Sequence, residues 1–544
     1  MKKTFIALSM ALMFTSFASK AQVATNMVLD IENGSTGSSP SSIVNINGTV
    51  YFMVNNNTEL WKSNGTPNGT VMLKNGFAPT IDAPKLVNFK GTLLFTAATS
   101  DKGIELWKSN GTKNGTVLLK DINAGVASSE PTDIKVINNL VYFSAYKSAI
   151  SRELWITDGT TNGTKLLKDI NEGSGSSRPT AFTLIGDKVY FKATTKDQGT
   201  ELWKTDGTNA GTMLVSDINP GAGSSNPSVL KFSFGDLYFT ANDGTHGTEL
   251  WKMDAITEAT SLVIDINPGG ASSDPAYFVK LNQVMYFRAN DGVNGSELWK
   301  TNGNAAGTLL VKDINPGNAS STPDQMKVWG DTIYFRATTS DFGTELWKSN
   351  GTNAGTTLLK DINPGTASST PSFLTIFNDA LYFRAETAAQ GAEIWITNGN
   401  TEGTSLLEDI SQGTGSSNPQ DFVVSNDDLF FSATNPDFGR ELWSVKILSS
   451  ARTLANTTTP VETMNAVLAP NILNNGSEVN IIFNGDASAA TVEIMDVTGN
   501  TVNSFEATSG TFQFTGNNLN SGLYVYQIKT NGNIIGKGKL VIAQ

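Results

Sequence analysis

The octapeptide ELWKSNGT occurs at residues 59–66, 105–112 and 345–352, and close variants of it are spread through most of the chain. The tryptophans of this motif are Trp61, Trp107, Trp155, Trp203, Trp251, Trp299, Trp347, Trp395 and Trp443. They are separated by 46 residues at the first step and by 48 residues at every later step. A period this regular indicates one supersecondary unit that is copied along the chain.

The unit at residues 371–410 shows which secondary structure is repeated. The short runs SFLTIF and ALYFRAE are separated by Asn-Asp and predict a hairpin, and AEIWITNG and TSLLEDI follow after polar turns that contain glycine. Four short strands in about 40 residues are typical of a β-propeller blade. We therefore predict an all-β fold in which residues 22–447 form a closed propeller of about nine four-stranded blades.

The repeated motif is explained by contacts between blades. Side chains alternate along a strand, so Glu and Trp of ELW face one side and Leu faces the other. The tryptophan is predicted to be a wedge between adjacent blades, and the Asn-Gly or Asp-Gly after it to form a tight turn with positive φ. Because each unit of a repeat contacts only its neighbours, we predict a structural role for the nine tryptophans.

The two ends of the repeat region complement each other. The last unit stops at ELWSVKIL, after its third strand, whereas MVLDI near the N-terminus matches a fourth strand that has nothing before it. Joining the two would complete the ninth blade and remove both exposed sheet edges.

Residues 1–21 have the pattern of a secretory signal peptide. Lys2 and Lys3 precede the apolar run FIALSMALMF, and SKA ends directly before Gln22. No comparable apolar stretch follows, so no membrane span is expected in the mature chain. The chain has no cysteine, which excludes disulfides and thiolate chemistry. Its formal charge of −12 argues against nucleic acid as a partner.

The pattern changes after the repeats. Residues 448–465 form a Ser/Thr-rich linker, and residues 466–544 carry alternating runs that predict a small antiparallel β-sandwich. The motifs VEIMDVTGNTV, NNLNSGLYVYQIKTNG and GKGKLVIAQ occur there in this order. They resemble the type A C-terminal sorting domain of Bacteroidota proteins that are exported by the type IX secretion system. One departure is that Pro470 and Asn471 are followed by Ile472, where the family usually has a second proline.

This resemblance implies export across both membranes, with the type IX secretion machinery as a partner and an extracellular or outer-surface location. The repeats themselves resemble the ELWxxDGT repeat proteins, a resemblance that implies no defined activity.

The loops between the second and third strands vary most from unit to unit, and variable loops on a rigid scaffold are the usual place for recognition. His246, the only histidine, lies in one such loop, where other units hold Lys102, Gln198, Asn294, Phe342, Gln390 or Phe438. A position that accepts so many side chains favours a solvated loop tip over a catalytic site. We therefore name His246, Phe342 and Phe438 as candidate contacts to a protein or glycan, and predict no catalytic, cofactor or metal residue.

One aspartate recurs at the end of the fourth strand. Its copies are Asp30, Asp121, Asp169, Asp217, Asp265, Asp313, Asp361 and Asp409. We predict that they bond backbone N–H groups of the turn that follows. Calcium bound at these Asp and Asn-Gly turns is the alternative, because hard cations prefer such oxygens.

These features predict a secreted or surface-attached module that binds a protein or polysaccharide without catalysis. Two alternatives are a polysaccharide hydrolase or lyase, whose paired carboxylates would lie on the rim, and a purely structural surface protein.

Overall fold

The computed structural model of the chain describes residues 23–80 and 83–447 and, further on, residues 465–469, 472–473, 478–484, 490–496, 500–507, 510–513, 519, 522–530 and 533–542. The predicted signal peptide and all but the last residue of the predicted linker lie outside the described residues. The chain divides into two compact units, residues 1–451 and 452–544. None of the described helices is long and apolar enough to span a bilayer.

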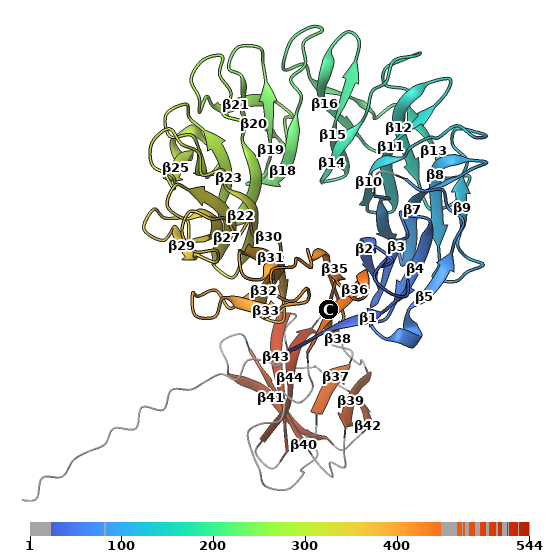
Figure 1. The fold of residues 1–544 in the computed structure, drawn as a ribbon, viewed down its shortest axis with the longest axis vertical. Helices are drawn as coiled ribbons and strands as arrows, with labels where there is room; N and C mark the ends of the chain where they lie inside the picture. Colours follow the sequence, from blue (N-terminus) through green and yellow to red (C-terminus); the bar gives the residue numbers. More distant parts are fainter. Residues whose placement is uncertain are drawn as a thin grey trace, which may run out of the picture. The chain divides into compact units, whose positions relative to one another are not determined.

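The first unit consists of nine four-stranded antiparallel sheets, which are arranged as the blades of a ring (Figure 1). Blades 1 to 3 comprise β2 Ser41–Ile46, β3 Thr49–Val54, β4 Glu59–Ser63 and β5 Val71–Lys74; β6 Leu86–Phe89, β7 Thr92–Thr99, β8 Gly103–Ser109 and β9 Val117–Lys120; and β10 Thr132–Ile137, β11 Leu140–Lys147, β12 Ser151–Thr157 and β13 Lys165–Lys168.

Blades 4 to 6 comprise β14 Thr180–Ile185, β15 Lys188–Thr195, β16 Gly199–Thr205 and β17 Met213–Ser216; β18 Ser228–Ser233, β19 Asp236–Asn242, β20 Thr248–Asp254 and β21 Thr260–Ile264; and β22 Ala276–Leu281, β23 Val284–Asn290, β24 Ser296–Thr301 and β25 Leu309–Lys312.

Blades 7 to 9 comprise β26 Asp324–Trp329, β27 Thr332–Thr339, β28 Gly343–Ser349 and β29 Thr357–Lys360; β30 Ser372–Phe377, β31 Ala380–Thr387, β32 Gly391–Thr397 and β33 Ser405–Glu408; and β34 Gln420–Ser425, β35 Asp428–Asn435, β36 Gly439–Ile447 and β1 Val23–Leu29. Short 3₁₀ turns, η1 Pro67–Gly69 and η2 Ala305–Gly307, precede the outer strands of blades 1 and 6.

The ring closes as the sequence predicts. β1 pairs antiparallel with β36, with Val23 opposite Ile447, and so supplies the fourth strand of blade 9. Each innermost strand contacts the innermost strand of the next blade, and β34 contacts β2. Lys446 also donates from Nζ to the carbonyl oxygen of Gly65 in blade 1, at 2.6 Å. The predicted nine-bladed closed propeller is therefore the observed fold.

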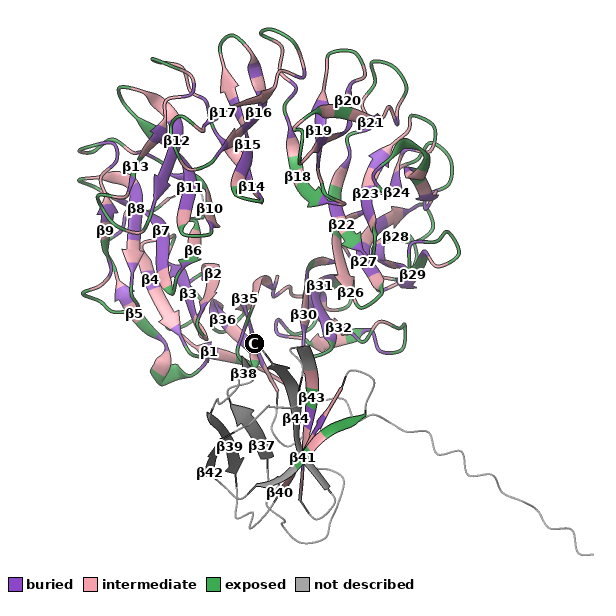
Figure 2. Cartoon of the chain, turned by 180° about the vertical axis from the view of Figure 1, so that it is seen from behind, coloured by how far each residue is buried: buried purple, intermediate pink, exposed green. Residues whose placement is uncertain are grey.

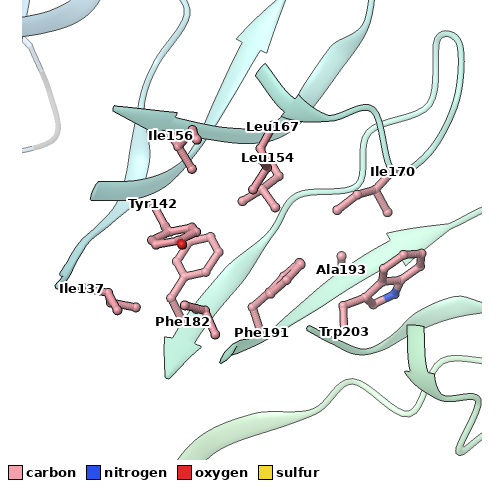
Figure 3. Close-up of a cluster of buried hydrophobic side chains, with 11 residues drawn as sticks. Ile137, Tyr142, Leu154, Ile156, Leu167, Ile170, Phe182, Phe191, Ala193 and Trp203 are labelled. Atoms are coloured by element: carbon pink, nitrogen blue, oxygen red, sulfur yellow. The ribbon is translucent and has the colours of Figure 1, made fainter. Parts of the chain in front are cut away.

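The core lies between the blades rather than at the centre of the ring. In the cluster of Figure 3, Trp203 of blade 4 packs with Leu154, Leu167 and Ile170 of blade 3. Seven of the nine repeat tryptophans are buried, whereas Trp61 and Trp443 are half-buried. The second and third strands form the buried centre of the blades, and exposure concentrates in the loops (Figure 2).

In eight of the nine blades, the glutamate of the ELW motif holds the crossover to the next blade. Glu297 is buried and accepts hydrogen bonds from the backbone N–H groups of Ile314 (2.8 Å) and Ser321 (2.7 Å) and from the Ser321 hydroxyl (2.5 Å). It thereby holds both ends of the crossover from blade 6 to blade 7. Equivalent bonds are made by Glu105, Glu153, Glu201, Glu249, Glu345, Glu393 and Glu441. Glu59 differs, because it accepts from Trp61 Nε1.

Blade 5 departs from the pattern at its outer turn, where DAITEAT replaces the usual Asn-Gly or Asp-Gly sequence. Glu258 in this turn accepts hydrogen bonds from Lys188 (2.9 Å), Lys204 and Tyr190 (3.0 Å) of blade 4. Burial alone would raise the pKa of Glu258, but these three donors lower it to about 2. The turn is therefore joined to the preceding blade by an ionic contact.

The described residues of the second unit form two sheets. One has the order β37-β39-β42, built from β37 Asn465–Ala469, β39 Glu478–Asn484 and β42 Gly510–Gln513. The other has the order β38-β44-β43-β40-β41, built from β38 Ile472–Leu473, β44 Asn533–Ile542, β43 Gly522–Thr530, β40 Ala490–Met495 and β41 Thr501–Ala507. The pairs are antiparallel, as expected, except that β38 and β44 are parallel.

Candidate functional site

A β-bulge shapes the inner wall of the ring, which we define as the innermost strands of the nine blades. In blade 6, Ala276 lies opposite Arg288 and Val279 opposite Tyr286, so three steps along β22 match two steps along β23. The extra residue, Tyr277, has φ 60°. Every blade except blade 2 has this bulge, with a non-glycine residue at positive φ: Ser42, Asp133, Ala181, Val229, Tyr277, Gln325, Phe373 and Asp421. A bulge re-aims the side chain that it carries.

The bulge position breaks the symmetry of the repeat. The proline two residues before the bulge is the same in all eight blades, whereas the bulge residue itself takes seven identities. Val229, Tyr277 and Phe373 are unusual in this conformation, because positive φ is strained for bulky and β-branched side chains. The ring therefore presents a different side chain from blade to blade at one geometrically equivalent position.

Five of these bulge residues line one cavity of about 600 Å³ on blades 5 to 9, which we call the inner-wall cavity. They are Val229, Tyr277, Gln325, Phe373 and Asp421, and Lys327 and Phe422 also line it. A smaller hollow of about 360 Å³ on blades 3 to 5 shares Val229 and includes Asp133 and Ala181. Figure 2 shows exposed segments on β18 and β22, two of the strands that form the cavity.

Two aromatic rings stand exposed on the wall of the inner-wall cavity. Tyr277 is 43% exposed and Phe373 is 37% exposed. The Arg288 guanidinium lies over the Tyr277 ring, 4.8 Å from its centroid, and Phe422 meets Phe373 edge-on at 6.3 Å between centroids. Aromatic surface beside a few polar groups is the usual composition of a ligand site.

Acidic side chains on the inner wall are accompanied by basic ones. Burial raises the pKa of Asp421, and nearby Arg440 opposes that shift. Burial also raises the pKa of Asp133, and Lys192, Lys85 and Arg152 oppose it. Asp133 and Asp421 lie on blades 3 and 9, with two blades between them.

The predicted rim residues lie in one equivalent loop of blades 5, 7 and 9. His246 bonds Asp243 through Nδ1 at 2.7 Å, and this bond raises the pKa of His246. In the equivalent loop of blade 6, Asn294 makes the same bond to Asp291. The bond of His246 to Asp243 therefore also stabilises its loop. Phe342 and Phe438 are 37% and 38% exposed. The structure brings none of these three residues into contact with another, and their role in binding stays a prediction.

The repeated aspartates cap the crossover turns, as predicted. The backbone N–H of the glycine four residues on donates to Oδ2 in seven of the eight copies, at 3.0–3.5 Å. The Oδ1 atom of all eight is buried and accepts no hydrogen bond. In the described part of the chain, no three His, Asp or Glu side chains converge in a way that would hold a metal ion. Calcium at these turns stays a prediction.

Sequence reasoning did not find the inner wall, although one signal was present. The residue that follows the Ser-Ser-x-Pro-x pattern varies from unit to unit, while the pattern around it repeats. When one position varies within an otherwise regular repeat, packing between blades does not determine which residue occupies it.

Comparison with known families gives one match. Residues 475–543 match the secretion system C-terminal sorting domain. This confirms the sorting-domain part of the predicted resemblance, whereas the resemblance of the repeats to ELWxxDGT proteins stays a prediction. No curated protein matches the chain.

Solved structures give only distant likenesses. A puromycin hydrolase shares 14% identity over 64% of this chain and 59% of its own, with a TM-score of 0.34. PorZ, a surface component of the type IX secretion system of Porphyromonas gingivalis, shares 11% identity over 93% of this chain and 82% of its own, with a TM-score of 0.31. AztD of Citrobacter koseri shares 12% identity over 59% and 85%, with a TM-score of 0.33. The chain thus spans little more than half of the hydrolase, and likenesses this distant carry no argument about function.

Proposed function

We propose that this β-propeller, whose sorting domain implies export to the cell surface or the extracellular space, is a non-catalytic module that binds a protein or polysaccharide through its inner wall. One observation carries the proposal: the bulge position varies between blades while the strands around it repeat. A purely structural ring has no need of such variation, because identical blades meet their neighbours in identical ways.

The inner-wall cavity supports binding rather than catalysis. It combines exposed aromatic rings with lysine, glutamine and aspartate side chains, and its volume of about 600 Å³ lies in the range of small-ligand pockets. A glycosidase-like reaction would call for two carboxylates on either side of one bond. Asp421 is the one carboxylate that lines this cavity, among the described residues.

The test is a binding screen of the mature chain against glycans and extracellular proteins, with analysis of reaction products for every hit. Phe373→Ala and Phe342→Ala form a matched pair, because both phenylalanines are 37% exposed, one on the inner wall and one on the rim. We expect saturable binding without product, weakened by Phe373→Ala and retained by Phe342→Ala. Product formation would overturn the proposal, and loss of binding in Phe342→Ala alone would move the site to the rim.

A further inference from the structure

The chemical class of the ligand follows from the charge of the inner wall, an inference that rests on the proposed function. The nine innermost strands carry four lysines and three aspartates. Their cross-strand neighbours add five basic side chains, Lys188, Lys192, Arg288, Arg336 and Arg384, and two acidic ones, Asp236 and Asp428. Nine basic side chains thus stand against five acidic ones, in a chain whose formal net charge is −12. Basic side chains are therefore concentrated on the inner wall of a protein whose net charge is negative.

Three arginines occupy one equivalent position in blades 6, 7 and 8, but they differ in their partners. Arg336 is neutralised by Asp324, which accepts from its Nε at 2.7 Å and its Nη2 at 2.5 Å. The residue opposite Arg288 is Ala276, and the residue opposite Arg384 is Ser372. Arg288 and Arg384 therefore have no carboxylate partner within ion-pair distance among the residues that the structure describes.

Arg384 is also incompletely hydrogen-bonded. Its Nε is buried without an acceptor, and the Oγ of neighbouring Ser372 is likewise buried and unpaired. Its charge lies near that of Arg440: burial lowers the pKa of Arg440, and Arg384 lowers it further. A buried donor without an acceptor destabilises the fold, and like charges repel, so an anion at this place would relieve both penalties.

The aromatic rings of the inner wall further restrict the chemical class of the ligand. Tyr277 and Phe373 lie on blades 6 and 8 and flank Gln325 on blade 7, so flat apolar surfaces alternate with an amide around the wall. A pyranose offers an apolar C–H face to an aromatic ring and hydroxyl groups to an amide, and a uronic acid adds a carboxylate. We propose that the inner wall binds an acidic oligosaccharide. Its sugar rings would stack on Tyr277 and Phe373 in the inner-wall cavity, and its carboxylates would pair with Lys327, which lines the cavity, and with Arg288 and Arg384 on the adjacent second strands.

The test uses the mature full-length chain and isothermal titration calorimetry. The probes are a short oligogalacturonate, a neutral cello-oligosaccharide of equal length and an oligoglutamate peptide, each at low and high salt. We expect the oligogalacturonate to bind, and raised salt to weaken binding about tenfold. Arg288→Gln should weaken it about tenfold, whereas Lys165→Gln, which removes an exposed charge from the outer strand of blade 3, should leave it unchanged. An unaltered melting temperature shows that Arg288→Gln still folds, and Lys327→Gln provides a second variant, at a residue that lines the inner-wall cavity.

The outcomes separate this inference from the function on which it rests. Equal, salt-independent binding of the neutral oligosaccharide, sensitive to Phe373→Ala, would overturn the acidic ligand and keep the inner-wall site. Binding of the oligoglutamate alone would overturn the assignment to a glycan. Absence of saturable binding for all three probes and throughout the glycan and protein screen would overturn the proposed function together with this inference.

Discussion

The buried glutamates predict that the propeller loses stability as the pH rises, and Glu297 allows this to be worked out. Burial raises the pKa of Glu297 from 4.5 to about 7, against the opposing hydrogen bonds from Ser321 and Ile314. A shift of this size corresponds to about 3 kcal/mol between the two protonation states. The folded chain keeps the proton that the unfolded chain releases near pH 4.5. The stabilisation is therefore complete below about pH 4.5 and is lost as the pH rises through about 7.

The assay is urea unfolding followed by tryptophan fluorescence at about pH 5 and about pH 8, for the wild type and Glu297→Gln. Glutamine keeps the size of the side chain and removes its charge. We expect the free energy of unfolding to fall between the two pH values by about 2–3 kcal/mol more in the wild type than in the variant. Glu59→Gln is the matched control, because Glu59 holds the same position in blade 1 but bonds Trp61. The same pH dependence in Glu297→Gln and the wild type would refute the reasoning.

Three further changes test the architecture. Trp347→Ala should lower the free energy of unfolding by about 3–5 kcal/mol, since the side chain is only 6% exposed and leaves a cavity between blades; a loss below about 1 kcal/mol in urea titration would contradict this. Glu258→Gln should lower the free energy of unfolding by about 2 kcal/mol at neutral pH, and this difference should shrink as the pH falls below 4.5 towards 2. An unchanged melting temperature at neutral pH would argue against the ionic contact. Deleting residues 23–34 should expose the edge of β36 and cause aggregation, and a monomer of unchanged melting temperature by size exclusion and calorimetry would count against ring closure.

The strands, the blade period and the ring closure could be predicted because each depends on local patterns that repeat. The inner wall could not, since one extra residue in a strand reverses the alternation on which such predictions depend. Simple alternation therefore gives no reason to single out Tyr277 or Phe373 as cavity residues.

The role of the ELW glutamate was missed for a different reason. In blade 6, Glu297 accepts a hydrogen bond from Ser321, which lies 24 residues later in the sequence. A contact over this distance does not show in the local periodicity of a strand. The serine lies 24 residues after the glutamate in seven of the eight units that make this bond, so the pair is visible only when whole units are compared.

Blade 9 has a consequence for chain connectivity. Ser38 and Glu441 are 403 positions apart in sequence, yet they make the same contact as their counterparts in consecutive blades. The ring therefore has no structural beginning, and its termini interrupt it inside blade 9, between the third strand β36 and the fourth strand β1. We expect circular permutants, with residues 23 and 447 joined by a linker and new termini placed in the exposed turn between the third and fourth strands of another blade, to fold to the same propeller.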